Sequence, residues 1–415
     1  MTQKNIVIVG GGFGGLSAAR ILLRKNHKVT LIDQRNYHLF QPLLYQVAMA
    51  GLSPAEIAYP LRALIGRKKN CKILLGKVIE VNKFEKWVRT ETNKVPFDSL
   101  IMACGSTYTY FGSDQWEPFA PGLKTIPQAT EIRRRVFLAF EKAEREADLK
   151  KREANLTFIV IGGGPTGVEL AGSLGEITSF NIYKDFDHIN AKQAKIILIE
   201  AGSRILPSMT EKLSEEAMKE LRELGVEVRL NTRVSDINAE GVRIGEEFIP
   251  SSTILWAAGV AANPINKSLG TELDKQGRLF VSRLLSLPGH DDIYVIGDQA
   301  RYEWGPEKTP LPGLAPVAMQ QGRFVAQVID LKARNKNLPD EFKYVDKGQM
   351  ATIGRGRAVA MYKGIEMHGF LAWMSWLVVH IYYLIGFKNR LFVIFQWAWM
   401  YLTFRREARL IIEKE

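Results

Sequence analysis

Residues 10–15 of the chain, GGGFGG, follow the apolar run IVIV at 6–9. The same arrangement returns at 162–167, where GGGPTG follows the run FIVI at 158–161. Both stretches have the spacing G-x-G-x-x-G where a buried strand is expected to turn into a helix. The first glycine permits the tight turn, the second lets the backbone approach a pyrophosphate, and the third lets the helix pack on the strand. One such turn is a weak signal, but two in this context predict two bound dinucleotides, most naturally a flavin and a nicotinamide.

Each glycine turn needs an acidic side chain at the end of the next strand, where a carboxylate accepts hydrogen bonds from a ribose. Asp33 stands 18 residues after the first turn and Glu200 stands 33 residues after the second. We expect the polar stretch 180–195 to be an insertion that accounts for the longer second spacing. Because the Glu200 carboxylate would bond a free 2′-hydroxyl and repel a 2′-phosphate, it favours NADH over NADPH. The nearby Arg204 weakens that preference.

A late Gly297-Asp298 pair closes the short apolar run 292–296, and we expect a helix to begin just beyond it. Flavoproteins with two nucleotide domains usually bind FAD at the N-terminal turn and close that site with such a pair. The sequence therefore predicts an α/β fold with two Rossmann-like dinucleotide-binding domains, one for FAD and one for NADH, and a C-terminal amphipathic helical region that anchors the chain to a membrane. The predicted domains are 1–115 and 285–340 for FAD, 116–284 for NADH, and 341–415 for membrane association.

Two further apolar runs, 100–105 and 254–259, each end in a turn of small residues that includes Gly105 in the first and Ala258-Gly259 in the second. A cofactor could lie against the backbone at such a turn. Taken alone, either run is more typical of an ordinary core strand.

The composition is ordinary for a globular protein of 415 residues, with 46% hydrophobic and 24% charged residues, but the net charge is +12. We find no nucleic-acid-binding motif, so an anionic membrane or simple solubility remains as the explanation. The only cysteines, Cys71 and Cys104, form no C-x-x-C pair. We therefore expect neither a metal site nor a redox-active disulfide beside the flavin, and electrons must pass directly to an acceptor. The start of the chain leaves no room for a signal peptide, so we expect the nucleotide domains in the cytosol.

The charged segment 128–153 has apolar residues at helical spacing and predicts one surface helix. Its arginine triplet, 133–135, would form a solvated face, with a membrane or partner patch as the less favoured interpretation.

The last 50 residues change character. An apolar segment at 370–387 precedes the basic trio 388–390, and a second apolar segment at 391–404 precedes the charged end 405–409. Both segments are short for a bilayer span, and a single span would strand cationic residues on the far side. We favour two helices in the membrane interface, with their tryptophans in the headgroup region and their basic residues on anionic lipid. A buried core or dimer interface remains open. The tryptophans concerned are Trp373, Trp376, Trp397 and Trp399.

Taken together, the chain resembles the bacterial type II NADH:quinone oxidoreductases, the non-pumping flavoprotein NADH dehydrogenases. The resemblance covers essentially the whole length, and the run 315–322 with its paired glutamines is its most specific part. The matching stretches are 10–15, 37–48, 162–169, 256–260, 297–298 and 315–322, with the aromatic C-terminus.

The resemblance implies that hydride passes from nicotinamide C4 to flavin N5 and that two electrons then pass to a quinone, feeding a respiratory chain without proton pumping. It also implies that Gln320 and Gln321 border the quinone pocket. Glu169 would lie near both the nicotinamide and the quinone and could relay protons. Binding NADH or the backbone is an equal alternative for Glu169.

The resemblance assigns the remaining site residues to FAD and NADH. The FAD pyrophosphate would lie on Gly10, Gly11, Gly12, Phe13 and Gly14, and Gly15 would complete the FAD-binding turn. The adenosine ribose would meet Asp33 and Gln34, the adenine Val78, and the phosphates His38. Pro42, Leu43, Ala315, Ala318 and Gln320 would border the flavin ring, with Gly105, Gly297 and Asp298 along the rest of the cofactor. NADH would be held by Gly162, Gly163, Gly164, Pro165, Thr166, Gly167, Glu200, Ala258 and Gly259.

Two alternatives remain. A sulfide:quinone oxidoreductase would share the FAD turns, but it needs cysteines near the flavin in the middle and late chain, and none follows Cys104. An NADH-sensing interaction module at the membrane would turn over slowly. The expected partners are a membrane quinone and an anionic lipid surface, with a homodimer possible and no nucleic acid. The expected location is the cytoplasmic face of the bacterial inner membrane, as a peripheral, monotopic protein.

Overall fold

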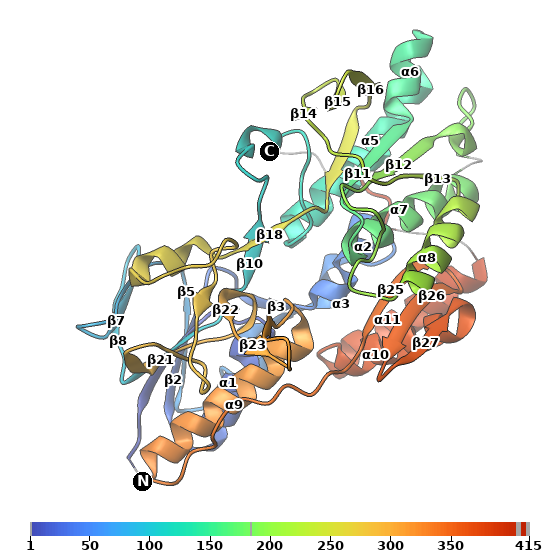
Figure 1. The fold of residues 1–415 in the computed structure, drawn as a ribbon. Coiled ribbons are helices and arrows are strands. Elements are labelled where there is room, and N and C mark those ends of the chain that lie inside the picture. The colour runs from blue at the N-terminus through green and yellow to red at the C-terminus, as the bar shows by residue number, and fades with distance from the viewer. Residues whose placement is uncertain (1, 183–184, 404–407, 412–415) are drawn as a thin grey trace. The chain divides into compact units, whose positions relative to one another are not determined.

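The computed structural model describes residues 2–182, 185–403 and 408–411. The chain divides into two compact units (Figure 1). Unit 1 contains Met1–Leu39, Ala58–Thr107 and Val260–Lys347, and unit 2 contains Phe40–Ile57, Tyr108–Gly259 and Gly348–Glu415. These two units are a different division from the nucleotide domains expected from the sequence, whose boundaries stay a prediction.

Unit 1 is built on a six-stranded sheet in the order β20-β21-β9-β1-β2-β5. Every neighbouring pair is parallel except β20 with β21. The strands are β1 (Asn5–Val9), β2 (Lys28–Asp33), β5 (Cys71–Leu75), β9 (Ser99–Met102), β20 (Ser286–Leu287) and β21 (His290–Val295). The continuous apolar run of β1 is buried because parallel strands of this kind are covered on both faces.

Two long helices of unit 1 pack against each other beside this sheet, α1 (Phe13–Arg24) and α9 (Ala315–Ala333). A Cβ at Gly322 would lie 2.2 Å from the carbonyl oxygen of Gly14, so glycine permits the close approach of the two backbones. The helix expected directly after Asp298 is absent: a 3₁₀ turn at Gly297–Gln299 leads into short strands, and α9 begins only at Ala315. That prediction was wrong. The segment 305–313 contains three prolines and two glycines, which break helices.

The smaller elements of unit 1 lie around this core. They are β3 (Tyr37–Leu39), β4 (Ala58–Pro60), α4 (Leu61–Leu64), β6 (Val78–Asn82), β7 (Trp87–Thr90), β8 (Lys94–Pro96), β19 (Leu279–Phe280), β22 (Ala300–Arg301), β23 (Glu303–Trp304) and β24 (Thr309–Pro310).

Unit 2 repeats the arrangement with a four-stranded parallel sheet in the order β13-β12-β11-β17. The strands are β11 (Thr157–Ile161), β12 (Lys195–Ile199), β13 (Val226–Arg229) and β17 (Thr253–Trp256). Helix α7 (Pro165–Glu176) follows β11, and α8 (Glu211–Glu223) follows β12. Between α7 and β12 the chain forms a π-helical turn at Ile177–Asn181 and a 3₁₀ turn at Ala191–Gln193. This is the lengthened crossover expected at 180–195, of which residues 183 and 184 lie outside the described residues.

The remaining elements of unit 2 are α2 (Leu44–Ala48), α3 (Pro54–Ile57), the hairpin strands β14 (Asp236–Ile237), β15 (Gly241–Ile244) and β16 (Glu247–Pro250), and a C-terminal sheet of β25 (Gln349–Gly354), β26 (Arg357–Tyr362) and β27 (Ile365–His368). Strand β10 (Ser106–Tyr108) pairs with β18 (Val260–Ala262), close to where the chain passes between the units.

The single surface helix expected at 128–153 is two helices, α5 (Ile126–Arg145) and α6 (Leu149–Asn155). Glu146 takes an extended backbone, and the Asp148 side chain caps α6 by accepting from the Lys150 and Lys151 backbone N–H groups. Such a cap marks the start of a new helix rather than the middle of a continuous one.

The expectation that the arginine triplet 133–135 forms a solvated face is also wrong. Arg133 is only 4% exposed and its Nη1 donates to the carbonyl oxygen of Ala408, 2.8 Å away. Arg134 and Arg135 both pair with the Glu131 carboxylate. Fixed acceptors of the folded chain therefore bind all three guanidinium groups.

The C-terminus forms α10 (Gly369–Tyr383) and α11 (Phe387–Thr403), so the basic trio 388–390 lies inside α11 rather than between two helices. Among the described residues, neither helix has both the length and the apolar character needed to cross a bilayer. Trp373, Trp376 and Trp397 are buried, and only Trp399 is substantially exposed, at 51%. The expectation that all four tryptophans face lipid is therefore wrong, because three of them pack the interior of unit 2.

Candidate functional site

The two glycine turns have the same local geometry, each completed by its acidic residue. In unit 1, Asp33 Oδ2 accepts from the Gly11 backbone N–H at 2.6 Å and Oδ1 accepts from Arg35 N–H at 2.7 Å. In unit 2, Glu200 Oε2 accepts from the Gly163 N–H at 2.6 Å. Its Oε1 accepts from the Gly202 N–H, also at 2.6 Å. Each carboxylate thus fixes the turn and lies at the end of the neighbouring strand.

The turns also leave room where a pyrophosphate needs it. A Cβ at Gly12 or Gly164 would meet nothing within 4 Å, and no side chain caps the helix that each begins. By contrast, a Cβ at Gly15 would lie 1.9 Å from the Gly10 carbonyl oxygen, and one at Gly167 only 1.8 Å from that of Gly162. The open helix ends, with N–H groups that no side chain caps, fit a phosphate charge.

His38 lies behind the first turn. It is 2% exposed, and its Nδ1 lies 3.0 Å from the Gly11 carbonyl oxygen, so Nδ1 carries the proton and donates. Burial lowers the pKa of His38 to about 4, so the ring is neutral. Its Nε2 is buried without a hydrogen-bond partner among the described residues. A neutral Nε2 accepts rather than donates, which suits a hydroxyl group of a cofactor better than a phosphate oxygen.

A second cluster in unit 1 surrounds Asp298. Asp298 Oδ2 accepts from Ser106 Oγ at 2.5 Å, and the Gly297 N–H donates to Gln321 Oε1 at 2.6 Å. These four residues line one hollow of unit 1 together with Val317. Ala318, at the start of α9, lies against both Gly14 and Gly297. The structure therefore brings the first turn, the Gly297-Asp298 pair and the start of α9 together.

The paired glutamines bond the backbone of unit 1. Gln320 Nε2 donates to the Val345 carbonyl oxygen at 2.9 Å, and its Oε1 accepts from the Val345 N–H at 3.0 Å. Gln321 is 1% exposed and holds Gly297. Both side-chain amides thus hold neighbouring backbone in place.

The other expected residues lie in more varied surroundings. Gln34 follows β2, and Val78 is a buried residue at the start of β6. Pro42 and Leu43 belong to unit 2, where Leu43 is fully buried. Ala315 begins α9. Gly105 and Gly259 both have a positive φ, at 69° and 78°.

The second turn gathers its expected partners within unit 2. The backbone of Ala258 lies 2.6 Å from where a Cβ on Gly162 would be. Pro165 opens α7, with Thr166 next to it. Glu200 closes the other side, as described above.

Glu169 lies one turn into α7 and is half-buried, and its carboxylate accepts from the Thr352 backbone N–H. Burial raises the pKa of Glu169 well above the usual 4.5. Glu169 therefore keeps its proton to a higher pH than an exposed glutamate does and can act as an acid, which its position in the sequence alone does not reveal.

Comparison with known proteins identifies the family. The pyridine nucleotide-disulphide oxidoreductase model matches residues 4–322. The type II NADH:quinone oxidoreductase Ndh of Mycobacterium tuberculosis is 40% identical over 428 residues, covering 100% of this chain and 91% of the relative. The chain belongs to the type II NADH:quinone oxidoreductases. A second relative from that organism, NdhA, is also 40% identical, over 98% of this chain and 88% of its own length.

Solved structures agree with this family at the level of the fold. NDH2 from Plasmodium falciparum, in complex with NADH, has a TM-score of 0.88 at 23% identity and covers 99% of this chain and 100% of its own. The sulfide:quinone oxidoreductase of Aquifex aeolicus has a lower TM-score of 0.74 at 20% identity, with 93% and 91% covered. The latter shows only that a sulfide-oxidising enzyme can share the fold of this type II NADH:quinone oxidoreductase.

Sequence reasoning missed the residues that support the site in this type II NADH:quinone oxidoreductase. Ser106 Oγ donates to the Asp298 carboxylate at 2.5 Å. Gln299 Oε1 accepts from the Cys104 N–H, also at 2.5 Å. Each directly follows a stretch that the sequence analysis singled out, but neither is itself part of a motif. Their only signal was proximity to the Gly105 turn and to the Gly297-Asp298 pair, which does not single out either side chain.

Proposed function

We propose that this chain oxidises NADH and reduces a membrane quinone by two electrons without pumping protons. The observation that carries the proposal is the pair of dinucleotide turns, each with an open helix end and an acidic residue fixed by a turn N–H. The 40% identity to type II NADH:quinone oxidoreductases over the full chain supports the same activity.

FAD would be held at the first turn by Asp33, the Gly297-Asp298 pair and the buried His38, and NADH at the second turn by Glu200. The corresponding domains would be 1–115 with 285–340 for FAD and 116–284 for NADH. When bound, FAD takes two electrons from NADH as a hydride and gives them to the quinone. The chain itself binds and orients both nucleotides.

Glu169 is the residue that we propose as proton donor to the quinone. The overall reaction NADH + H⁺ + quinone → NAD⁺ + quinol takes one proton from the medium. A carboxylic acid whose pKa is raised by burial keeps its proton to a higher pH than an exposed one and can release it to a nearby oxygen.

The function is tested by following the flavin through both half-reactions. Anaerobic mixing with NADH should bleach the flavin absorbance, and a short-chain quinone should restore it. Steady NADH oxidation should be slow without quinone and fast with it. Flavin that is reduced by sulfide but not by NADH would favour the sulfide:quinone alternative. Fast reduction by NADH without reoxidation by any quinone would favour an NADH sensor.

Glu200→Gln tests the nucleotide preference. The carboxylate accepts from the free 2′-hydroxyl of NADH and repels a 2′-phosphate, whereas a neutral amide does not repel it. We expect the ratio of kcat/KM for NADH over NADPH to fall roughly tenfold, which corresponds to about 1.4 kcal/mol of lost discrimination. The amide oxygen of this variant can still accept from the Gly163 N–H, so the turn should survive. A wild-type enzyme that used both nucleotides equally would contradict this assignment.

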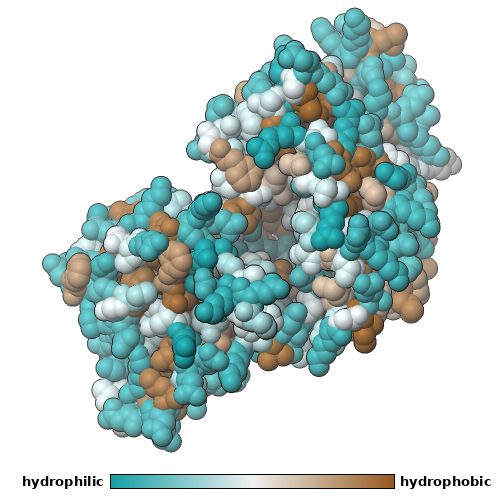
Figure 2. Space-filling view, in the orientation of Figure 1, coloured by the Kyte–Doolittle hydropathy of each residue, from teal (hydrophilic) through white to brown (hydrophobic). Residues whose placement is uncertain are grey.

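Membrane association would rest on the exposed apolar side chains of α10 and α11. Figure 2 shows brown, hydrophobic patches on the molecular surface. On these two helices the most exposed apolar residues are Phe370, Leu371, Val378, Tyr382, Phe387, Phe392, Phe395 and Leu402. Isolated apolar residues are normal on a surface, but so many on two adjoining helices are typical of a contact site. We propose that these helices lie in the interface at the cytoplasmic face of a bacterial inner membrane. A homodimer stays a prediction.

The basic residues expected to meet anionic lipid differ in their surroundings. Lys388 is exposed above the Phe392 ring. Arg390 donates to the carbonyl oxygens of Leu384 and Tyr382. Arg409 pairs with Asp185, while Arg405 and Arg406 lie outside the described residues. Of the described cations, Lys388 is the best placed to add electrostatic attraction to lipid.

Replacing Leu371 and Phe395 by glutamate should release the protein from vesicles. Each side chain is more than 70% exposed, so the change leaves the core of unit 2 in place. Losing about 1.5 kcal/mol of apolar burial per side chain should lower the partition coefficient roughly tenfold for each. Co-sedimentation with anionic vesicles at low and high salt measures this. Phe84→Glu, at an equally exposed position in unit 1, is the matched control. Equal loss in the control would show that added charge, not α10 and α11, causes the release.

A further inference from the structure

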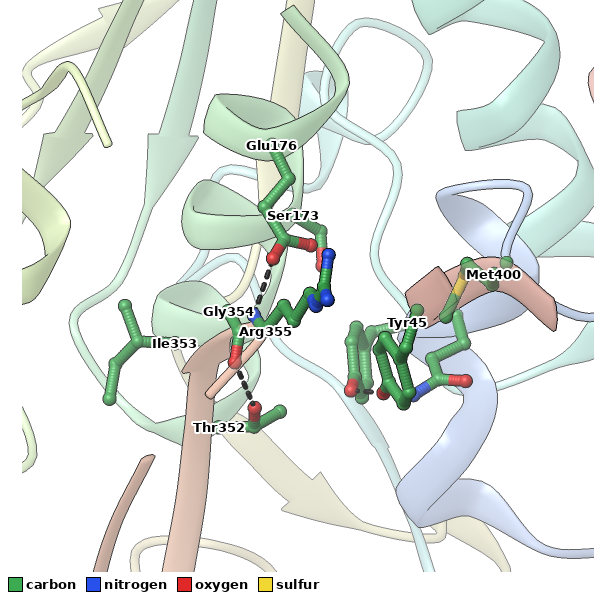
Figure 3. Close-up of a pocket in the computed structure, with 11 residues that line it drawn as sticks. Tyr45, Ser173, Glu176, Thr352, Ile353, Gly354, Arg355 and Met400 are labelled. Atoms are coloured by element: carbon green, nitrogen blue, oxygen red, sulfur yellow. Dashed lines mark hydrogen bonds between the residues drawn. The ribbon is translucent and has the colours of Figure 1, made fainter. Parts of the chain in front are cut away.

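A pocket of unit 2 lies beside α7, with Tyr45, Ser173, Glu176 and Arg355 in its lining (Figure 3). Glu176 and Ser173 come from α7, Arg355 follows β25, and Tyr45 comes from α2. The helix and the strand approach so closely that a Cβ at Gly172 would lie 1.8 Å from the Ile353 carbonyl oxygen. One wall of the pocket is therefore formed where α7 and β25 pack closely together.

Glu169, Ser173 and Glu176 occupy one face of α7, because residues four and seven positions apart lie above one another on a helix. Both glutamates are held by the same strand segment. Glu169 accepts from the Thr352 backbone N–H, and Glu176 accepts from the Arg355 backbone N–H. Glu176 and Ser173 line the pocket, whereas Glu169 stands one turn before Ser173 with a raised pKa. A line of polar side chains therefore runs along α7 from the pocket to Glu169.

The hydroxyl of Tyr45 faces the same place with a fixed orientation. Trp397 Nε1 donates to Gln46 Oε1 at 2.7 Å, and Gln46 Nε2 donates to the Tyr45 hydroxyl oxygen at 2.9 Å. Because the Tyr45 oxygen accepts from Gln46, its own O–H must point elsewhere. Both Glu169 and Glu176 are close enough to raise the pKa of this buried phenol further, after burial itself. Tyr401 and Arg355 are the other titratable groups of the pocket lining.

We propose that this pocket is the entry route by which protons from water reach Glu169, with Glu176 as the first acceptor and Ser173 bridging the two. The proposal rests on the function proposed above. In each turnover the Glu169 O–H bond breaks and one of the two O–H bonds of the quinol forms, on a quinone that has received two electrons from NADH. The other quinol hydrogen is balanced by the one that leaves NADH as hydride. The Glu169 carboxylate then takes back the proton that Glu176 received from water. Glu176 acts through Glu169 and does not itself touch the quinone.

Glu176→Gln tests the route, since a glutamine can still accept from the Arg355 N–H but cannot carry a proton. We expect flavin reduction by NADH to be unchanged. Reoxidation by a short-chain quinone should slow roughly tenfold, less than the ~100-fold typical of losing a direct acid, because water can still enter the pocket. The loss should grow with pH and shrink when imidazole buffer is raised. Glu176→Asp should restore most of the rate.

Glu220→Gln is the matched control, because Glu220 is another buried glutamate of unit 2 with a pKa raised to about 7, and it does not line the pocket. It should change neither half-reaction. If Glu176→Gln failed to fold, Ser173→Ala should still slow reoxidation several-fold and leave flavin reduction intact. Reoxidation by Glu176→Gln at the wild-type rate and with the wild-type pH profile would overturn the route. A wild-type enzyme that reduced no quinone would instead overturn the proposed function.

Discussion

Glu169→Gln should slow reoxidation of the reduced flavin by quinone by ~100-fold, the scale of losing a general acid. Flavin reduction by NADH should change little, because hydride transfer needs no proton from the protein. The amide keeps the shape of the carboxylic acid and can still accept from the Thr352 N–H. Stopped-flow mixing of each half-reaction separately measures both rates. Equal slowing of reduction and reoxidation would show that Glu169 positions the nicotinamide.

The pH dependence of this variant follows from the raised pKa of Glu169, which burial produces. The wild-type reoxidation rate should fall as pH rises through that folded pKa, because the acid is lost, while the glutamine variant should be flat. Stability follows the same sign. Above pH 4.5 the unfolded state has released this proton and the native state still holds it. The contribution of Glu169 to stability is therefore lost progressively as pH rises towards its folded pKa. Thermal melts of both forms across that range measure this.

Gly15→Ala should abolish FAD binding and leave little folded protein. Its Cβ would lie 1.9 Å from the Gly10 carbonyl oxygen, so α1 could no longer pack against the turn. Gly12→Val should separate cofactor binding from folding, because a Cβ there meets nothing of the chain and would fill only the space that a pyrophosphate needs. We expect Gly12→Val to be folded and colourless. The flavin absorbance per mole of purified protein, with a thermal melt, measures both outcomes.

The second turn supplies the matched control for this experiment. A Cβ at Gly164, like one at Gly12, meets nothing within 4 Å, so Gly164→Val should retain FAD and lose affinity for NADH. Its flavin should remain yellow and be reduced only at NADH concentrations far above those of the wild type. Loss of FAD from Gly164→Val would contradict the assignment of the two cofactors to the two turns.

The α/β fold was predictable because its decisive information is local. Each glycine turn couples a buried strand to a helix within about a dozen residues. The turn at Gly297 was predicted, but the next helix begins only at Ala315. The prolines between the two break helices, and the Gly-Asp motif gives no information about them. The two C-terminal helices were predicted and are present, but three of their four tryptophans are buried. Membrane anchoring by this region is therefore a proposal.

The surroundings of individual side chains were less predictable, because partners distant in sequence decide them. Arg133 donates to a carbonyl oxygen 275 positions away, and Gln46, which donates to the Tyr45 hydroxyl, itself accepts from Trp397 of α11. Glu169 has a raised pKa because the folded chain buries it beside β25, more than 170 residues later. No pattern within one element encodes such contacts.

The carboxylates of Asp33 and Glu200 each bond two backbone N–H groups of the chain itself. The loops around the nucleotides therefore have their shape before any ligand arrives, and folding rather than binding bears the entropy loss of ordering them. Little of the binding free energy at such a site is therefore spent on ordering the loops when a nucleotide binds. An enzyme of this kind must release NAD⁺ and bind NADH in every cycle while keeping its flavin. Its turnover gains speed when the nucleotide-binding site does not have to fold again in each cycle.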